Sequence, residues 1–357
     1  MNHAFLFDDS IPFEQRALRV FTFQYARNPV FKQFCEVLDV NPENVTSPED
    51  IPMLPVEAFR DAECTCWPGE KHDLVFSSSG TTGMRRSRHP VKDACLYAES
   101  VEKGMSAFYT MDEYVILAYT PGYNENPDSS LVWMLNHLIG LDRSGLGRFL
   151  PLGKGLRQVQ KIDQGLSISQ KQGQKQGSSP RDSGLNHDEI ARITASGKKL
   201  MLFGAAFGLI DMAEASPVTL PADSIIVETG GMKTHRREMG REEMHTKLAT
   251  AFGLPVGSIH SEYGMTELLS QAWMQGDGVF RCPHWMRISV HDPDNPLDRL
   301  PDGHEGLIGI TDLANLNSCS FLMTGDAGVS NPDGSFRVLG RMQPGNLRGC
   351  NFLLEED

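Results

Sequence analysis

Apolar residues near the start of the chain recur at helical spacing. The segment FEQRALRVFTFQYARNPVFKQFCEVL (13–38) predicts two helices, because Pro29 after Asn28 breaks the pattern. Two prolines then make the segment IPMLPVEAFR (51–60) an extended connector. The short apolar run Leu74-Val75-Phe76 predicts a strand that leads directly into a loop of serine, glycine and threonine.

The middle of the chain alternates between runs of strand length and runs of helix length. Residues 94–110 and 129–140 predict helices on either side of a buried strand, YVILAY (114–119). The alternation continues as strand, helix, strand and helix in KKLMLFG (198–204), AAFGLIDMAEA (205–215), SIIVETGG (224–231) and REEMHTKLATAFG (241–253). Gly253 is placed to end the last helix. This order predicts an α/β fold whose mostly parallel sheet has helices on both faces.

Short strands such as GLIGITDL (306–313) and SFRVLGR (335–341) replace the helices after about residue 278. We therefore expect an α/β core of two sub-lobes over 1–277, a small β-rich lobe over 278–345 and a C-terminal tail over 346–357. Residues 160–184 are rich in Gln, Lys, Ser and Gly, which predicts a solvated loop insertion within the core.

Composition and charge exclude several classes of protein. Of the 357 residues, 40% are hydrophobic and 22% are charged, as in globular proteins. The formal net charge of −13 argues against broad nucleic-acid binding, which requires a basic surface. We see no signal peptide, and no apolar run approaches the ~18 residues of a membrane span. Seven cysteines without a framework spacing predict free thiols, so we expect a cytoplasmic protein.

The strongest local signal is the loop Ser77-Ser78-Ser79-Gly80-Thr81-Thr82-Gly83, directly after the predicted strand. Its glycines let the backbone curl so that several N–H groups point into one concavity, and its hydroxyls add further donors. This loop predicts an anion site, with an ordinary surface loop as the alternative. It is not a Walker A loop, because no Lys-Ser/Thr pair closes it.

Three weaker motifs follow the loop in the chain. His260-Ser261-Glu262-Tyr263-Gly264-Met265-Thr266-Glu267 comes just past another predicted strand and offers an aromatic ring for a purine and a carboxylate for magnesium. Thr324-Gly325-Asp326 predicts a turn whose acid can accept bonds from ribose hydroxyls. Gly340-Arg341 offers a guanidinium for ribose or phosphate. Each motif alone is equally compatible with an ordinary structural role.

Together, in this order and spacing, the four motifs resemble the core motifs of the adenylate-forming superfamily, which includes acyl-CoA synthetases, luciferases and peptide-synthetase adenylation domains. The resemblance implies ATP and Mg²⁺ as cofactors, and it assigns roles by position. Tyr263 would flank the adenine, Thr266 would touch the α-phosphate, Glu267 would bind Mg²⁺, and Asp326 and Arg341 would hold the ribose. The remaining nucleotide-binding positions would be Ser78, Ser79, Gly80, Thr81, Thr82, Gly83, Gly231 and Gly264.

A narrower resemblance runs nearly end to end. FQYARNPVFKQFC, IPMLPVEAF, SSSGTTG followed by Ser87-Arg88-His89, SSLVWML and ETGGMK are similar to the acyl-protein synthetase of the bacterial bioluminescence fatty-acid reductase complex. That family activates a fatty acid with ATP, carries the acyl group on a cysteine near its C-terminus and passes it to a partner reductase. The resemblance implies that Cys350 is that thiol.

The chain departs from the superfamily pattern at three places. Arg85 and Arg86 stand where most members have a lysine, and Met342-Gln343 stands where many carry an Asp or Lys hinge. We also expect the small mobile C-terminal domain of acyl-CoA synthetases, with its catalytic lysine, to be missing. Lys233 in the segment Gly230-Gly231-Met232-Lys233 is our candidate to supply the positive charge, with a surface lysine at a strand end as the alternative.

Two other functions remain open at this point. One is a ligase that transfers the acyl group to coenzyme A, like the phenylacetate enzymes. The other is a nucleotide-binding scaffold that organises a partner reductase without catalysis, for which the arginines after the phosphate loop leave room.

Overall fold

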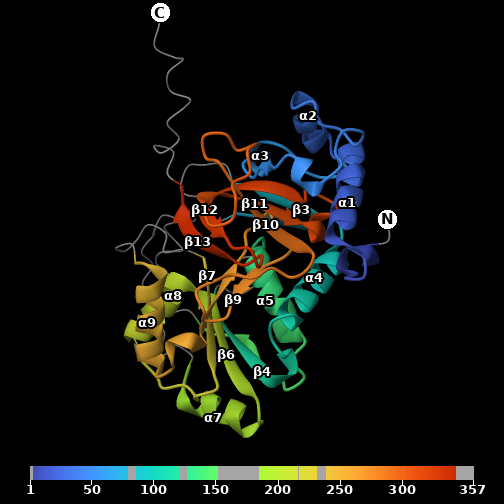
Figure 1. Cartoon of the computed structure of the whole chain (residues 1–357). Helices are drawn as coiled ribbons and strands as arrows, with labels where there is room; N and C mark the ends of the chain where they lie inside the picture. Colours follow the sequence, from blue (N-terminus) through green and yellow to red (C-terminus); the bar gives the residue numbers. More distant parts are fainter. Residues whose placement is uncertain are drawn as a thin grey trace, which may run out of the picture.

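Two helices near the N-terminus begin the fold that the computed structural model describes (Figure 1). The helices α1 (Phe13–Arg27) and α2 (Pro29–Val37) are separated at Asn28, as the proline predicted. The Asn28 side chain accepts hydrogen bonds from the backbone N–H groups of Val30 and Phe31, which caps α2. The structure describes residues 3–78, 86–120, 127–151, 185–215, 217–230 and 239–342.

A six-stranded sheet forms the centre of the molecule, in the strand order β5-β4-β6-β7-β8-β9. Every neighbouring pair from β5 to β8 is parallel, and only β9 runs antiparallel to β8. The prediction of a mostly parallel sheet is therefore confirmed. The strands are β4 (Tyr114–Tyr119), β5 (Arg148–Phe149), β6 (Lys199–Ala205), β7 (Ile225–Thr229), β8 (Ile259–Tyr263) and β9 (Ala272–Met274).

Helices cover both faces of this sheet, as predicted (Figure 1). One face packs against α4 (Ala94–Ser106) and α5 (Ser130–Gly140), and the core between them includes Ile116 and Phe203. The opposite face packs against α7 (His187–Ala195), α8 (Ala206–Ala215) and α9 (Arg241–Phe252). Gly253 ends α9 with a φ of 66°, the left-handed conformation that the sequence predicted for it.

A second sheet joins the C-terminal strands to the N-terminal part of the chain. Its strand order is β1-β12-β11-β10, and β13 also pairs with β12. The strand β1 (Leu54–Pro55) runs parallel to β12 across the expected boundary at residue 278, and Phe31 of α2 stacks on Phe321 at 5.8 Å. The expected domain boundaries stay a prediction, and residues 160–184 lie outside the described part. The remaining strands are β10 (Met286–His291), β11 (Glu305–Asp312), β12 (Phe321–Ser330) and β13 (Phe336–Arg341).

Two small elements complete the part that concerns function. The strands β2 (Leu74–Ser77) and β3 (Arg88–Val91) form an antiparallel hairpin around the predicted phosphate loop. The short helix α3 (Ala58–Asp61) precedes it. None of the described helices is long and apolar enough to cross a bilayer.

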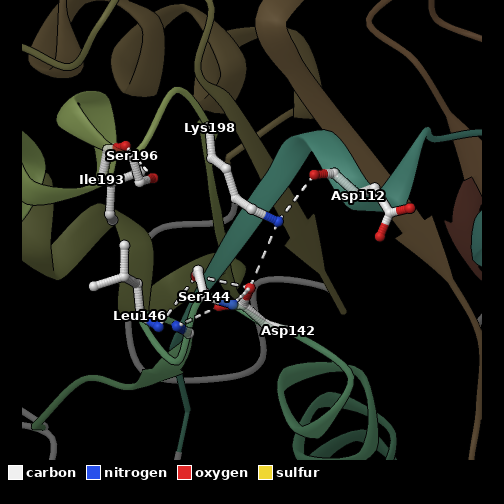
Figure 2. A network of polar contacts seen from close by, with 8 residues as sticks. Asp112, Asp142, Ser144, Leu146, Ile193, Ser196 and Lys198 are labelled. Atoms are coloured by element: carbon white, nitrogen blue, oxygen red, sulfur yellow. Dashed lines mark hydrogen bonds and ion pairs between the residues drawn. The ribbon is translucent and has the colours of Figure 1, made fainter.

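A polar network holds together the loops at the amino ends of β4 and β6, as Figure 2 shows. The Lys198 ammonium donates to the Asp112 carbonyl at 2.9 Å and lies 3.7 Å from the Asp142 carboxylate. Asp142 also accepts the backbone N–H groups of Ser144 and Gly147, each at 2.9 Å. Because ligands of parallel sheets bind at the opposite, carboxyl ends of the strands, this network belongs to the scaffold.

Candidate functional site

The motif residues from three separate strands meet beyond the carboxyl end of β8. Tyr263 is the last residue of that strand, and its phenol donates to Asp326 of β12 at 2.9 Å. The Nε of Arg341, at the end of β13, donates to the other oxygen of Asp326 at 3.1 Å. The motif residues Tyr263, Asp326 and Arg341 therefore lie together, and the roles that the resemblance assigned to them stay predictions.

The local structure of two motifs differs from the sequence prediction. Thr324-Gly325-Asp326 was expected to be a turn, but it lies inside the strand β12. His260-Ser261-Glu262-Tyr263 was expected to follow a strand, but it forms β8 itself. Both predictions were wrong because glycine and polar residues within these strands interrupt the apolar alternation on which strand prediction depends.

The strand pairing explains how Asp326 and Arg341 come together. They are opposite residues in the antiparallel ladder of β12 and β13. The Asp326 backbone N–H donates to the Thr324 hydroxyl at 3.1 Å. The Asp326 side chain is 14% exposed and the Arg341 side chain 70% exposed, so the carboxylate is fixed at the base while the guanidinium reaches into solvent.

The Tyr263 ring is a buried part of the site. It packs against Phe280 and Phe336, each with ring centroids 5.8 Å away. Burial, together with the nearby Asp326 carboxylate, raises the pKa of this phenol, which keeps it a neutral donor. The proposed contact of Tyr263 with an adenine stays a prediction.

Two buried carboxyls on β7 and β8 were missed by the sequence reading. Thr229 lies opposite Glu262 in the parallel ladder, and its hydroxyl donates to the Glu262 carboxyl. Glu228 lies opposite Ser261, accepts its hydroxyl and has the Arg241 Nε 3.5 Å away. The two acids face opposite sides of the sheet because successive side chains alternate.

The surroundings of these two acids differ in charge. Burial raises the pKa of Glu262 to about 7, and the Thr229 hydroxyl only partly opposes this. Glu228 has two basic neighbours, since the His245 Nε2 also lies 3.6 Å from it. The only sequence signal was the placement of an acid immediately before Thr229 and before Tyr263.

The turn after β8 places Thr266 and Glu267 beside the β2–β3 hairpin. Glu267 is 6% exposed, and its carbonyl accepts the Asn315 amide at 2.8 Å. Burial raises the pKa of its carboxyl, while a hydrogen bond from Ser87 and the charge of Arg341 lower it. This carboxyl thus lies between the phosphate-loop hairpin and the Asp326–Arg341 pair.

The base of the predicted phosphate loop is well defined. The Ser78 backbone N–H donates to the Ser87 carbonyl at 3.1 Å, and the Ser87 N–H donates to the Ser78 hydroxyl at 3.1 Å. These bonds extend the β2–β3 ladder by one step toward the loop. Several predicted site residues lie outside the described part of the chain, namely Ser79, Gly80, Thr81, Thr82, Gly83, Gly231, Lys233 and Cys350.

The donor set suits a magnesium ion only in combination with phosphate. In the described ranges, no three His, Cys, Asp or Glu side chains gather at metal-binding distance. Mg²⁺ typically binds through one or two carboxylates plus substrate phosphates, and Glu267 offers one carboxylate of that kind. Glu267 therefore fits the role that the resemblance implied.

Comparison with known proteins identifies the family. The profile of the acyl-protein synthetase family LuxE matches residues 175–357, just over half of the chain. No curated protein matches the chain.

Solved structures share the fold at low sequence identity. A 2-hydroxyisobutyryl-CoA ligase, in an open conformation with 2-HIB-AMP and CoA, is 15% identical with a TM-score of 0.58, covering 92% of this chain and 68% of the ligase. The same ligase in its thioesterification state is 16% identical with a TM-score of 0.57, covering 92% of this chain and 67% of the ligase. ATP-bound MatB from Rhodopseudomonas palustris is 16% identical with a TM-score of 0.46, covering 76% of this chain and 49% of MatB. The chain thus spans about two thirds of the first ligase, with which it shares the fold, and it belongs to the acyl-protein synthetase family LuxE.

Proposed function

We propose that this protein activates a fatty acid with ATP, forms an acyl-adenylate and transfers the acyl group to a protein cysteine. The observation that carries the proposal is the convergence of Tyr263, Asp326 and Arg341 with the Thr266–Glu267 turn in a chain of the acyl-protein synthetase family. A partner reductase, or another acyl-acceptor protein, as the later acyl acceptor follows from the same family resemblance.

The Asp326 carboxylate fits a ribose. Each of its oxygens accepts one hydrogen bond in the structure, from Tyr263 or Arg341, and a carboxylate oxygen can accept a second. Two adjacent hydroxyls of a ribose supply two such donors. The tyrosine and arginine hold the carboxylate in place before the nucleotide arrives, so little ordering is required on binding.

The first chemical step joins the acid to the nucleotide. An oxygen of the substrate carboxylate attacks the α-phosphorus of ATP, and the bond to pyrophosphate breaks. Both reactants are anions, so the site must supply positive charge and donors. Glu267 would hold Mg²⁺, which neutralises phosphate charge when bound. Arg341, Thr266 and the phosphate loop from Ser78 onward would orient the nucleotide, and Lys233 is our candidate for the remaining charge.

The second step releases AMP. The Cys350 thiolate would attack the acyl carbonyl of the mixed anhydride, a carbon–sulfur bond would form, and the bond from that carbon to the phosphate oxygen would break. The product is a thioester that keeps the acyl group reactive. The thiol proton is lost to solvent before the attack, and AMP leaves as the phosphate anion.

The test is acid-dependent exchange of labelled pyrophosphate into ATP, across aliphatic and aromatic carboxylic acids. We expect exchange with long aliphatic acids, and acyl label on the wild-type protein but not on Cys350→Ser. Equal labelling of Cys350→Ser would exclude that thiol as the carrier. A Lys233→Ala variant with wild-type exchange would likewise remove Lys233 from the mechanism.

Two other outcomes would replace the proposal. Rapid thioester formation with added coenzyme A, without labelled protein, would assign the chain to the acyl-CoA ligases. Binding of ATP without exchange for any acid would favour a nucleotide-binding scaffold.

A further inference from the structure

A buried histidine connects the phosphate-loop hairpin to the turn that carries Thr266 and Glu267. His89 lies on β3 and is fully buried. Its Nδ1 is 2.8 Å from the Thr266 carbonyl oxygen, and its Nε2 is 2.9 Å from the Ser318 hydroxyl. The ring also meets Phe59 edge-on, with centroids 5.3 Å apart.

These contacts determine the tautomer of His89. A carbonyl oxygen can only accept, so Nδ1 carries the proton and donates to Thr266. In the neutral ring Nε2 is then an acceptor, and the Ser318 hydroxyl donates a hydrogen bond to it. Burial lowers the pKa of His89 to about 4, so the ring is neutral at physiological pH. Each ring nitrogen therefore has one suitable partner.

The position of His89 relates two parts of the proposed site. Phe76 pairs with His89 across the hairpin, one step before Ser77, where the phosphate loop begins. On the other side, the Thr266 carbonyl immediately precedes Glu267, whose carboxyl accepts a hydrogen bond from Ser87 of the same hairpin. His89 and Ser87 therefore each donate a hydrogen bond from the β2–β3 hairpin to the Thr266–Glu267 turn.

We propose that His89 is a positioning residue that sets the distance between the β2–β3 hairpin, at the base of the predicted phosphate loop, and the Thr266–Glu267 turn through its bond to the Thr266 carbonyl. This inference rests on the proposed function, since it deepens the role of the same site. The in-line reaction requires pyrophosphate on the loop side and the α-phosphate on the turn side to be held in one geometry. A misplacement of about 1 Å can cost on the order of 100-fold in rate.

The chain supplies a matched control in His291 on β10. Its Nε2 lies 2.8 Å from the Ser289 hydroxyl and its Nδ1 lies 2.8 Å from the Pro296 carbonyl oxygen, so its bonding repeats that of His89. It is 4% exposed and pairs with Leu307 of β11, and its two ring partners, Ser289 and Pro296, are not motif residues. If His89 has only a structural role, its substitution should have the same effects as substitution of His291.

The experiment compares His89→Phe, His89→Asn and His89→Gln with His291→Phe in the full-length protein. The asparagine amide lies where Nδ1 lies and can still donate to Thr266, whereas glutamine reaches Ser318 but not Thr266. Pyrophosphate exchange gives kcat and the KM of the acid, and calorimetry gives the Kd of MgATP. Thermal unfolding reports the stability of each variant.

We expect His89→Phe and His89→Gln to lose about 100-fold in kcat, with the KM of the acid unchanged and MgATP binding at least tenfold weaker. His89→Asn should stay within about threefold of wild type, and His291→Phe should lose stability without losing kcat. Equal kcat and Kd for the glutamine and asparagine variants would overturn the inference. So would a His89→Phe protein that matches His291→Phe in both quantities.

The failure of the proposed function is distinguishable from this result. If wild type binds MgATP but exchanges no pyrophosphate, the proposed activity fails, and the order of the Kd values still decides the role of His89. If wild type does not bind MgATP, both are overturned.

Discussion

The buried Glu262 should make the protein less stable as pH rises, and Glu262→Gln should remove that dependence. Burial raises the pKa of this carboxyl from its ordinary value of 4.5 to about 7 in the folded protein. The folded state therefore binds a proton that the unfolded state releases between these two values. The stability from this group is fully present below pH 4.5 and is lost as pH rises through about 7.

The magnitude follows from the difference between the two pKa values. At about 1.36 kcal/mol for each unit of pKa, the difference between 4.5 and about 7 amounts to about 3 kcal/mol. Glutamine can still accept the hydrogen bond that Thr229 donates to Glu262, so the substitution removes the charge and keeps this contact. We expect the Glu262→Gln protein to match wild type at pH 4, below both pKa values, and to be more stable by about 3 kcal/mol at pH 8.

Urea unfolding at pH 4, 5, 6, 7 and 8 measures this directly, because the midpoint shifts with stability while the slope stays constant. Glu228→Gln is the control, because Arg241 and His245 lie beside that carboxylate. Removing its charge should lower the free energy of unfolding by about 1–2 kcal/mol at pH 7. The reasoning is refuted if Glu262→Gln is less stable than wild type at pH 8, or if both proteins keep the same pH dependence.

Three further substitutions test other parts of the structure. Asp142→Asn removes the charge and replaces one of the two carboxylate oxygens that accept the Ser144 and Gly147 N–H groups with an amide NH2, so it should cost about 2 kcal/mol in urea unfolding at pH 7. Although burial acts to raise the Asp142 pKa, the Ser144 bonds bring it below 3.8, so wild type should lose this advantage as pH falls through that range. A stability difference between wild type and variant that is the same at acid and neutral pH would contradict the assignment. Gly253→Ala should cost about 1 kcal/mol in thermal unfolding because its φ is 66°, and an unchanged midpoint would count against this. Tyr263→Phe frees one oxygen of Asp326 and should weaken ATP binding by about fivefold in calorimetry, with tight binding in the variant as the contrary result.

The elements that the sequence could predict are those set by local patterns. The proline after Asn28 and the glycine at 253 mark real helix boundaries, and the apolar runs around Val115 and Val227 are real parallel strands. Each of these depends on neighbours within a few residues. The roles of the motif residues came from a family resemblance, which orders the site by position along the chain.

The contacts that define the site could not be read from local patterns. His89 bonds to Thr266, 177 residues away, and nothing in the sequence around either one indicates the other. Asp312 is fully buried on β11 and accepts the backbone N–H groups of Leu269 and Ser270, which are also distant from it in the sequence. Such partners are chosen by the packing of two sheets, which a pattern of hydrophobic positions does not specify.

The pairing of β1 with β12 has a consequence for synthesis of the chain. The Gln24 amide donates to the Asn315 carbonyl at a separation of 291 residues, and Leu54 pairs with Leu322. At about 5–20 residues per second, a ribosome needs on the order of 15–60 s to produce the second partner after the first. During that time the apolar faces of α1 and α2, including Phe21 and Phe31, lack the strand that buries them. We therefore expect the nascent N-terminal part to bind holdase chaperones, and its release to coincide with the emergence of β12.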